Sequence, residues 1–418
     1  MGFNPFKEKG IPIEKQTKPW VELNVKPYDS STVDPYTRLR GILMNGIEAE
    51  AVQFYHNFHR HIDIPELRAQ LATLRRIEQQ EQKMVNWMIP AEESTLQVTI
   101  GYEQLAVDLT AALAQAEQDP YVKAALDFAL LEDFDHLYRY ANLLAMTDEK
   151  KAESIVKQFT EIIPGRPTVI EHCHPVDTVR NFTDRSKTSA QTKLHIETII
   201  AAEQQTMNFY MNIGNRLADQ NGRGLYQEIA QIEEQHVTHY GSLTDPRASW
   251  FEMAVLHEYN ECYMYYSCMQ SETDDKAKGV WQMCLENELT HLQTAAEIMK
   301  KYENKDPEEM FPDSMPEPIV LKPAKEYVRS ILSSQLHYTG DKTKMVPLNM
   351  SESQDRYQTF LTTSNDDFAP SQKVVQDCIN SQGEDYRVET EGPHPADILL
   401  SRRDIPDQKS LLEFCKNR

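Results

Sequence analysis

The sequence predicts an all-α protein of two tandem four-helix bundles, followed by an extended, partly helical C-terminal region. Eight stretches have the apolar spacing of helices, and Pro, Asn-Gly or Asp-Pro breakers separate most of them. A fixed offset relates the first four stretches to the last four, which indicates a duplication. The eight stretches are residues 41–58, 67–88, 94–117, 121–145, 193–218, 224–243, 248–270 and 276–302.

These stretches divide the chain into five regions. An arm without a sustained apolar period precedes the first bundle, and a polar, proline-containing linker separates the two bundles. The C-terminal region is rich in Pro, Ser, Asp and Gln, with one clear helical pattern near residues 325–338. We expect it to wrap the bundles or to form an oligomer contact. The regions are arm 1–40, first bundle 41–146, linker 147–190, second bundle 191–303 and C-terminal region 304–418.

The duplication rests on one offset of 155 residues that needs no insertion in any loop. It relates Phe54-Tyr55 to Phe209-Tyr210, Ile77-Glu78 to Ile232-Glu233, His136-Leu137 to His291-Leu292, Glu48 to Glu203, Glu103 to Glu258, and Asp133 to Glu288. A single offset across all four helices is hard to obtain by chance, so we interpret the chain as two copies of one four-helix domain.

Charge and composition exclude several classes of protein. The 418 residues carry a formal net charge of −22, with the basic residues diluted among acidic ones. Nucleic acid and anionic membrane surfaces require clustered Lys and Arg, so neither is expected as a partner. The sequence has no apolar run long enough to span a membrane and no signal-peptide pattern, so we expect a cytoplasmic protein.

The second copy carries acidic and imidazole side chains at spacings that suit a dinuclear metal site. Residues three apart on a helix share a face, so each such pair can reach the same ion. Two ExxH pairs on alternate helices, plus a Glu on each of the others, is the pattern of carboxylate-bridged di-iron or di-manganese bundles. Oxygen and imidazole ligands without sulfur favour iron or manganese. The candidate ligands are Glu203, Glu233, His236, Glu258, Glu261, Glu288 and His291.

This set resembles the ferritin-like superfamily, and specifically rubrerythrin, over residues 191–302. The features shared with rubrerythrin are Glu203 seven residues before Tyr210, the two ExxH pairs, and the doubled Glu258 and Glu261 of the third helix. The resemblance implies a non-haem di-iron centre that reduces peroxide. It further implies that Glu203 and Glu261 are terminal or mobile ligands, that Glu233 and Glu288 bind or bridge, that Glu258 completes the set, and that His236 and His291 fix one metal each.

Two departures from rubrerythrin matter. No two of the six cysteines form a CxxC pair, so a fused rubredoxin is absent and the electron donor must be a separate molecule. Only 25 residues separate Glu233 from Glu258, which is short for the long crossover of ferritin-like folds. A plain up-down-up-down bundle is therefore an open alternative.

The first copy has the same pattern with substitutions. Glu81 replaces the second-helix His, and Ala106 replaces the extra Glu of the third helix. Glu132 and Asp135 lie beside Asp133, so the choice of ligand among them stays open. This copy is expected to hold one or two metal ions with altered or no activity, to be a second active site, or to be a metal-free structural copy. Its candidate ligands are Glu48, Glu78, Glu81, Glu103, Asp133 and His136.

The expected function is that of a di-iron oxidoreductase acting on hydrogen peroxide or dioxygen, with two iron or manganese ions in the second bundle. Tyr210 and Tyr266 are the candidates for donating hydrogen bonds to a metal-bound oxygen species. The same ligands would serve a manganese catalase or a ferroxidase. An iron-binding or storage protein without further catalysis is the alternative from another class.

Overall fold

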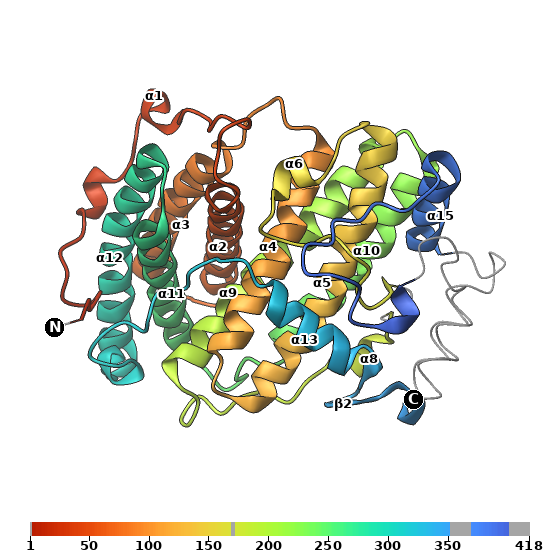
Figure 1. Ribbon diagram of the computed structural model, residues 1–418. Coiled ribbons are helices and arrows are strands. Elements are labelled where there is room, and N and C mark those ends of the chain that lie inside the picture. The colour runs from red at the N-terminus through yellow and green to blue at the C-terminus, as the bar shows by residue number, and fades with distance from the viewer. Residues whose placement is uncertain (1, 169–171, 352–368, 401–418) are drawn as a thin grey trace. The chain divides into compact units, whose positions relative to one another are not determined.

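The computed structural model describes residues 2–168, 172–351 and 369–400, and each of the eight expected stretches is helical. Figure 1 labels these helices along the chain. Their bounds are α2 (Pro35–Arg60), α3 (Pro65–Asn86), α4 (Thr95–Ala116), α5 (Pro120–Thr147), α9 (Ala190–Ile213), α10 (Gln220–Gly241), α11 (Trp250–Ser271) and α12 (Asp275–Glu303).

The helix starts repeat between the two copies. Ser94 and Ser249, which are 155 residues apart, both form capping boxes at the starts of α4 and α11. Asp119 and Asp274, also 155 apart, both accept hydrogen bonds from the first backbone N–H groups of α5 and α12. The duplication read from the sequence therefore extends to the caps of two helix pairs, whereas α3 begins after Ile64 without a side-chain cap and its counterpart α10 is capped by Asp219.

The structure divides the chain into two compact units, and neither unit is a run of four consecutive helices. Unit 1 comprises Met1–Glu92, Thr183–Gln205 and Thr244–Val320, and unit 2 comprises Glu93–Phe182, Thr206–Leu243 and Leu321–Arg418. The expectation of consecutive bundles at 41–146 and 191–303 is corrected accordingly. Unit 1 combines the hairpins α2–α3 and α11–α12, whereas unit 2 combines the hairpin α4–α5 with α10 and the C-terminal part of α9.

Unit 1 is built from the hairpins α2–α3 and α11–α12, with α11 against α2 and α12 against α3 (Figure 1). Its core includes Leu39, Leu71, Val255 and Leu292, none of which is exposed beyond 1%. The N-terminal arm belongs to this unit, since η1 (Ile13–Lys15) packs on α12 and α1 (Trp20–Leu23) packs on α3. Helix α2 begins at Pro35, earlier than expected, because Asp34 caps it and proline suits the first helical position.

Unit 2 is built around α5, in which every residue from Ala125 to Ala145 is buried. The hairpin α4–α5 packs with α10, and two helices of the C-terminal region, α13 (Lys325–Gln335) and α15 (Pro370–Gln382), also pack on α5. Strands β1 (Tyr338–Asp341) and β2 (Lys344–Pro347) form an antiparallel hairpin. Because α5 is covered from several directions, its polar residues are enclosed along with its apolar ones.

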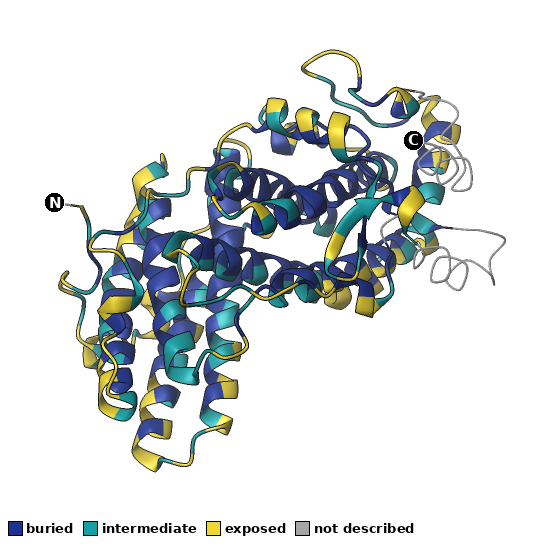
Figure 2. Ribbon diagram, turned by 90° about the horizontal axis from the view of Figure 1, so that it is seen from below, coloured by how far each residue is buried: buried dark blue, intermediate teal, exposed yellow. Residues whose placement is uncertain are grey.

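Buried positions follow the inward helix faces of each unit, while exposed positions gather on outer faces and at helix ends (Figure 2). Among the described residues, no helix combines the length and apolar character that crossing a lipid bilayer requires. The buried faces of both units include polar and charged residues as well as apolar ones.

Candidate metal centres

Unit 1 encloses a cluster of acidic side chains and one imidazole, contributed by α2, α3, α11 and α12. Pairs three residues apart on α3, α11 and α12 point inward together, and α2 adds one carboxylate. Two subsets each offer ligand atoms within 4.8 Å of one another: Glu78, Glu81, Glu288 with His291, and Glu78, Glu258, Glu261 with Glu288. All members are buried: Glu48, Glu78, Glu81, Glu258, Glu261, Glu288 and His291.

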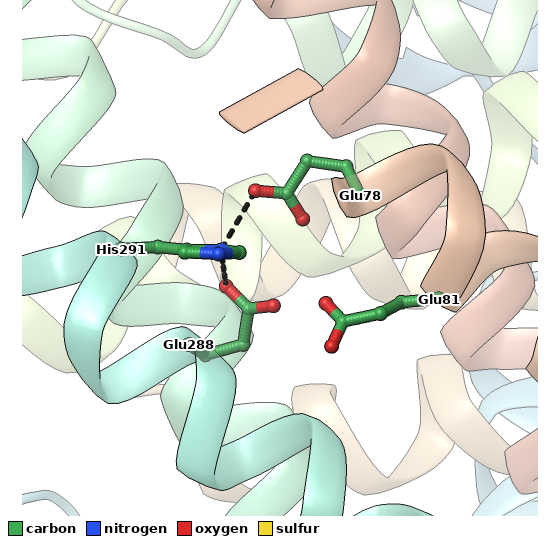
Figure 3. A group of neighbouring side chains, drawn as sticks. All are labelled: Glu78, Glu81, Glu288 and His291. Carbon is green, nitrogen blue, oxygen red and sulfur yellow. Dashed lines mark hydrogen bonds and ion pairs between the residues drawn. The ribbon is translucent and has the colours of Figure 1, made fainter. Parts of the chain in front are cut away.

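His291 shows how the cluster is oriented. Its Nδ1 atom lies 2.9 Å from Glu78 Oε1 and 3.0 Å from Glu288 Oε2, and Figure 3 shows these carboxylates converging on the ring. Its Nε2 atom lies 2.8 Å from Oε1 of Gln16 in the N-terminal arm. The Gln16 amide nitrogen donates to the Ile11 carbonyl, so Gln16 Oε1 is the acceptor and Nε2 of His291 carries the proton. That arrangement directs Nδ1 into the cluster, as a metal-binding imidazole requires.

Many carboxylate oxygens of this cluster lack a hydrogen-bond donor among the described residues. Both oxygens of Glu258 and of Glu261, and one oxygen each of Glu48, Glu81 and Glu288, have no hydrogen-bond partner among the described residues. Buried anions without donors are costly, and bound cations would compensate them. These orphaned oxygens, together with the imidazole, therefore fit a metal centre.

Burial and mutual repulsion change the pKa values of the carboxylates and the imidazole in this cluster. Burial, and then the charge of neighbouring carboxylates, raises the pKa of Glu48, Glu81 and Glu261 well above the usual range. Burial raises the pKa of Glu258 and Glu288 to about 7. Burial alone would lower the pKa of His291, but Glu288 and Glu78 raise it. Without cations, the cluster holds protons that metal ions would displace.

Two further side chains orient carboxylates of unit 1. The Asn287 amide donates a hydrogen bond to Glu81 Oε1, and the Tyr265 hydroxyl donates to Glu48 Oε1. Tyr266, the expected donor, is instead stacked on Phe3, with ring centroids 4.5 Å apart. The neighbouring Tyr265 reaches the cluster in its place.

Unit 2 encloses a second cluster, in which one carboxylate lies between two imidazoles. Glu233 Oε1 is 3.1 Å from Nδ1 of His136, and Glu233 Oε2 is 3.3 Å from Nδ1 of His236. Asp133 Oδ1 is 3.3 Å from His236 Nδ1, and Glu103 Oε2 is 3.9 Å from His136 Nδ1. This is the geometry in which a carboxylate can bridge two metal ions that each hold one imidazole.

The surroundings of this cluster hold its members in place. Nε2 of His236 lies 2.6 Å from Glu132 Oε2, and the other oxygen of Glu132 is 3.9 Å from buried Arg166. The Tyr210 hydroxyl donates to Glu103. Burial would raise the pKa of Glu233, but hydrogen bonds from His136 and His236, together with their charge, hold it below the usual range.

The structure separates the seven ligands assigned to the second copy. Glu258, Glu261, Glu288 and His291 join α2 and α3 of the first copy in unit 1, whereas Glu233 and His236 lie in unit 2 with Glu103, Asp133 and His136. The expected grouping of one site per copy is corrected, because helical periodicity does not specify which hairpins pair. Glu203 is buried on α9, which crosses the boundary between the units after Gln205. It shares a helix face with Tyr210, two turns later.

The neighbouring acids of α5 have different partners. Asp135 accepts two hydrogen bonds from the guanidinium group of Arg139 and one each from the backbone N–H groups of Gly165 and Thr168. Both of its carboxylate oxygens therefore have partners outside the cluster. Asp133 points to His236 Nδ1, and Glu132 points to its Nε2. Gln16 and Asn287 carried no sequence signal of their own, except that Asn287 is the 155-residue counterpart of Glu132. Tyr265 lies seven residues after Glu258, the same spacing as Tyr210 after Glu203, and this spacing could have favoured it over Tyr266.

No protein-family model, curated protein or solved structure gives a significant match to this chain.

Proposed function

We propose that the chain is a carboxylate-bridged dinuclear metal protein, with one centre in each unit, that reacts with hydrogen peroxide or dioxygen. The observation that carries the proposal is Glu233, whose two oxygens face the Nδ1 atoms of His136 and His236 separately. Two imidazoles on opposite sides of one buried carboxylate are what two adjacent metal ions would need. Neither unit has the complete rubrerythrin set, so the support comes from the wider pattern of di-metal bundles.

In unit 2 the proposed ligands are Glu103, Asp133, His136, Glu233 and His236. Their three carboxylates would offset most of the charge of two divalent cations. Oxygen and imidazole donors without thiolate favour iron or manganese as the resident metal.

In unit 1 the proposed ligands are six carboxylates and His291. This set is richer in oxygen and in negative charge than that of unit 2, because Glu81 stands where unit 2 has His236 and Glu261 stands where it has Ala106. We propose that unit 1 is a second metal centre with different reactivity rather than a metal-free copy. Its orphaned carboxylate oxygens support this assignment.

A redox-active metal pair would supply the electrons that cleave an O–O bond. The chain itself would orient the ligands and control protons. Glu132 would keep the His236 proton on Nε2, which leaves Nδ1 directed inward, and Tyr210 would hold Glu103 through its hydroxyl. Both clusters are enclosed by packed helices, so only small oxidants such as peroxide or dioxygen suit them.

Electrons for peroxide reduction would come from a separate donor, because the chain has no CxxC pair for a rubredoxin-type iron. A manganese catalase needs no donor, since it oxidises one peroxide while reducing another. A ferroxidase would consume iron(II) as substrate. These are the alternative activities that the same ligands would support.

The first test is metal analysis of the full chain purified from iron-replete or manganese-replete cells. We expect up to four iron or manganese equivalents per chain, two for each centre, and fewer than one after careful reconstitution would overturn the proposal. Oxygen evolution from peroxide without reductant would identify a catalase. Turnover only with a supplied electron donor would identify a peroxidase, and stoichiometric oxidation of added iron(II) would identify a ferroxidase.

A further inference from the structure

The two clusters differ by a coupled change at two contacting positions. In unit 2, His236 faces Glu132, and in unit 1, Glu81 faces Asn287. The 155-residue offset relates Glu81 to His236 and Glu132 to Asn287. The same pair of sites therefore holds imidazole with carboxylate in one unit and carboxylate with amide in the other.

Hydrogen-bond chemistry explains why the two positions differ together. An imidazole that presents Nδ1 to a metal carries its proton on Nε2 and needs an acceptor there, which a carboxylate provides. A carboxylate ligand needs a donor on its outer oxygen, which an amide provides. Glu at both positions would place two buried anions in contact, which is strongly unfavourable.

We propose that Asn287 and Glu132 are positioning residues that set the metal preference of each unit, by fixing a carboxylate or an imidazole as the ligand on α3 or α10. This inference rests on the proposed metal-binding function. The site with Asn287 prefers hard ions such as Mn²⁺, because six of its seven donors are carboxylates. The site with Glu132 has two imidazoles, so its preference for borderline ions such as Co²⁺ or Zn²⁺ is stronger than that of the site with Asn287.

The unit 1 side is tested in the full chain carrying His136→Ala and Glu233→Ala, which removes unit 2 ligands. Three proteins are compared in this background. The first has no further change, the second carries Asn287→Glu, and the third carries both Glu81→His and Asn287→Glu. Mn²⁺ and Co²⁺ affinities are measured separately by equilibrium dialysis, and the visible spectrum of bound Co²⁺ reports imidazole coordination. Far-UV circular dichroism and thermal unfolding establish that each variant is folded.

The single change Asn287→Glu should weaken binding of both ions by about 10–100-fold, the usual range for losing an outer hydrogen-bond partner. Adding Glu81→His should restore binding, raise the Co²⁺ to Mn²⁺ affinity ratio by about tenfold, and change the Co²⁺ spectrum. A helix defect alone would not be rescued by a second change or alter the ratio. An unchanged ratio and spectrum in the double variant, with metal bound, would overturn the inference and leave the proposed function standing.

The reverse exchange in unit 2 provides the matched control. In a chain carrying Glu78→Ala and His291→Ala, His236→Glu should weaken binding because the introduced carboxylate would face Glu132. Adding Glu132→Asn should restore binding and lower the Co²⁺ to Mn²⁺ ratio. This second exchange keeps the inference testable if the unit 1 variants do not fold. Absence of metal binding in the unmodified chain would overturn both the inference and the proposed function.

Discussion

The Tyr210 hydroxyl donates a 2.5 Å hydrogen bond to Oε1 of Glu103, and both side chains are fully enclosed in unit 2. Burial, and then the charge of Glu103, raises the pKa of this tyrosine well above its usual range, so it stays a donor. The tyrosine was expected near the metal ligands from its spacing to Glu203. The structure connects it to a ligand on α4 instead.

Replacing Tyr210 by Phe should destabilise the metal-free protein by about 1–3 kcal/mol, because a buried carboxylate loses a donor. Chemical denaturation in the presence of a chelator measures this change. Tyr55 is the 155-residue counterpart, and its hydroxyl has no hydrogen-bond partner among the described residues. Tyr55→Phe should therefore be close to neutral, and equal losses in the two variants would contradict the prediction.

Removing single ligands should reveal which residues share a centre. Glu233→Ala and His136→Ala should each remove the metal that is bound in unit 2. Glu78→Ala and His291→Ala should each remove the metal that is bound in unit 1. The double variant within one unit should then lose little more than either single variant, since ligands of one site are not additive. If Glu233 and His291 instead behaved as one site, the separation of the copies between units would be wrong. Metal analysis of folded protein decides between these outcomes.

The metal-free protein should lose stability as the pH rises from about 4.5 to about 7. Burial raises the pKa of Glu258 and Glu288 to about 7, so the folded state binds more protons than the unfolded state in this window. Stability then falls with increasing pH, the reverse of the usual behaviour of acidic residues. Thermal unfolding with chelator at pH 5 and pH 7.5 measures the trend.

Glu288→Gln is the control for this pH dependence, because the amide is neutral at every pH and should flatten the slope. Metal addition should have its largest stabilising effect at the higher pH, where fewer protons compete for the carboxylates. If the metal-free protein became more stable as the pH rose from about 4.5 to about 7, the raised pKa values of Glu258 and Glu288 would be contradicted.

Gln16→Ala should weaken metal binding in unit 1 by about 10–100-fold and leave unit 2 unchanged, because His291 loses the acceptor that fixes its protonated nitrogen. Gln16→Glu keeps an acceptor at this position and should retain most of the affinity. Titration of each variant with Mn²⁺ measures the effect. Equal weakening in both variants would show that Gln16 acts through packing of the arm alone.

The helices were predictable because their apolar spacing, breakers and caps are local properties of the sequence. The shared helix face of candidate ligands such as Glu233 and His236 was also predictable, because helix geometry fixes residues three apart on one side. The pairing of hairpins was not, since apolar faces are similar in the two copies. One sequence feature did point to it: 25 residues between Glu78 and Glu103, and again between Glu233 and Glu258, leave little room for a crossover within one bundle.

The structure removes that difficulty, because α3 and α4 belong to different units, as do α10 and α11. The link from Asn86 to Thr95 does not have to return along the bundle it leaves. Contacts of isolated residues such as Gln16 were beyond sequence reasoning, because the arm has no periodic pattern. Their positions depend on tertiary packing alone.

The exchange of hairpins between copies has a consequence for evolution of the protein. If two identical chains of half this length exchanged hairpins, two-fold symmetry would make their two sites the same, and any substitution would appear in both. In a single covalent chain each residue occurs once, so one site can change while the other is conserved. The pairs Glu132–His236 and Asn287–Glu81 differ in this way, which the joining of two copies into one chain permits.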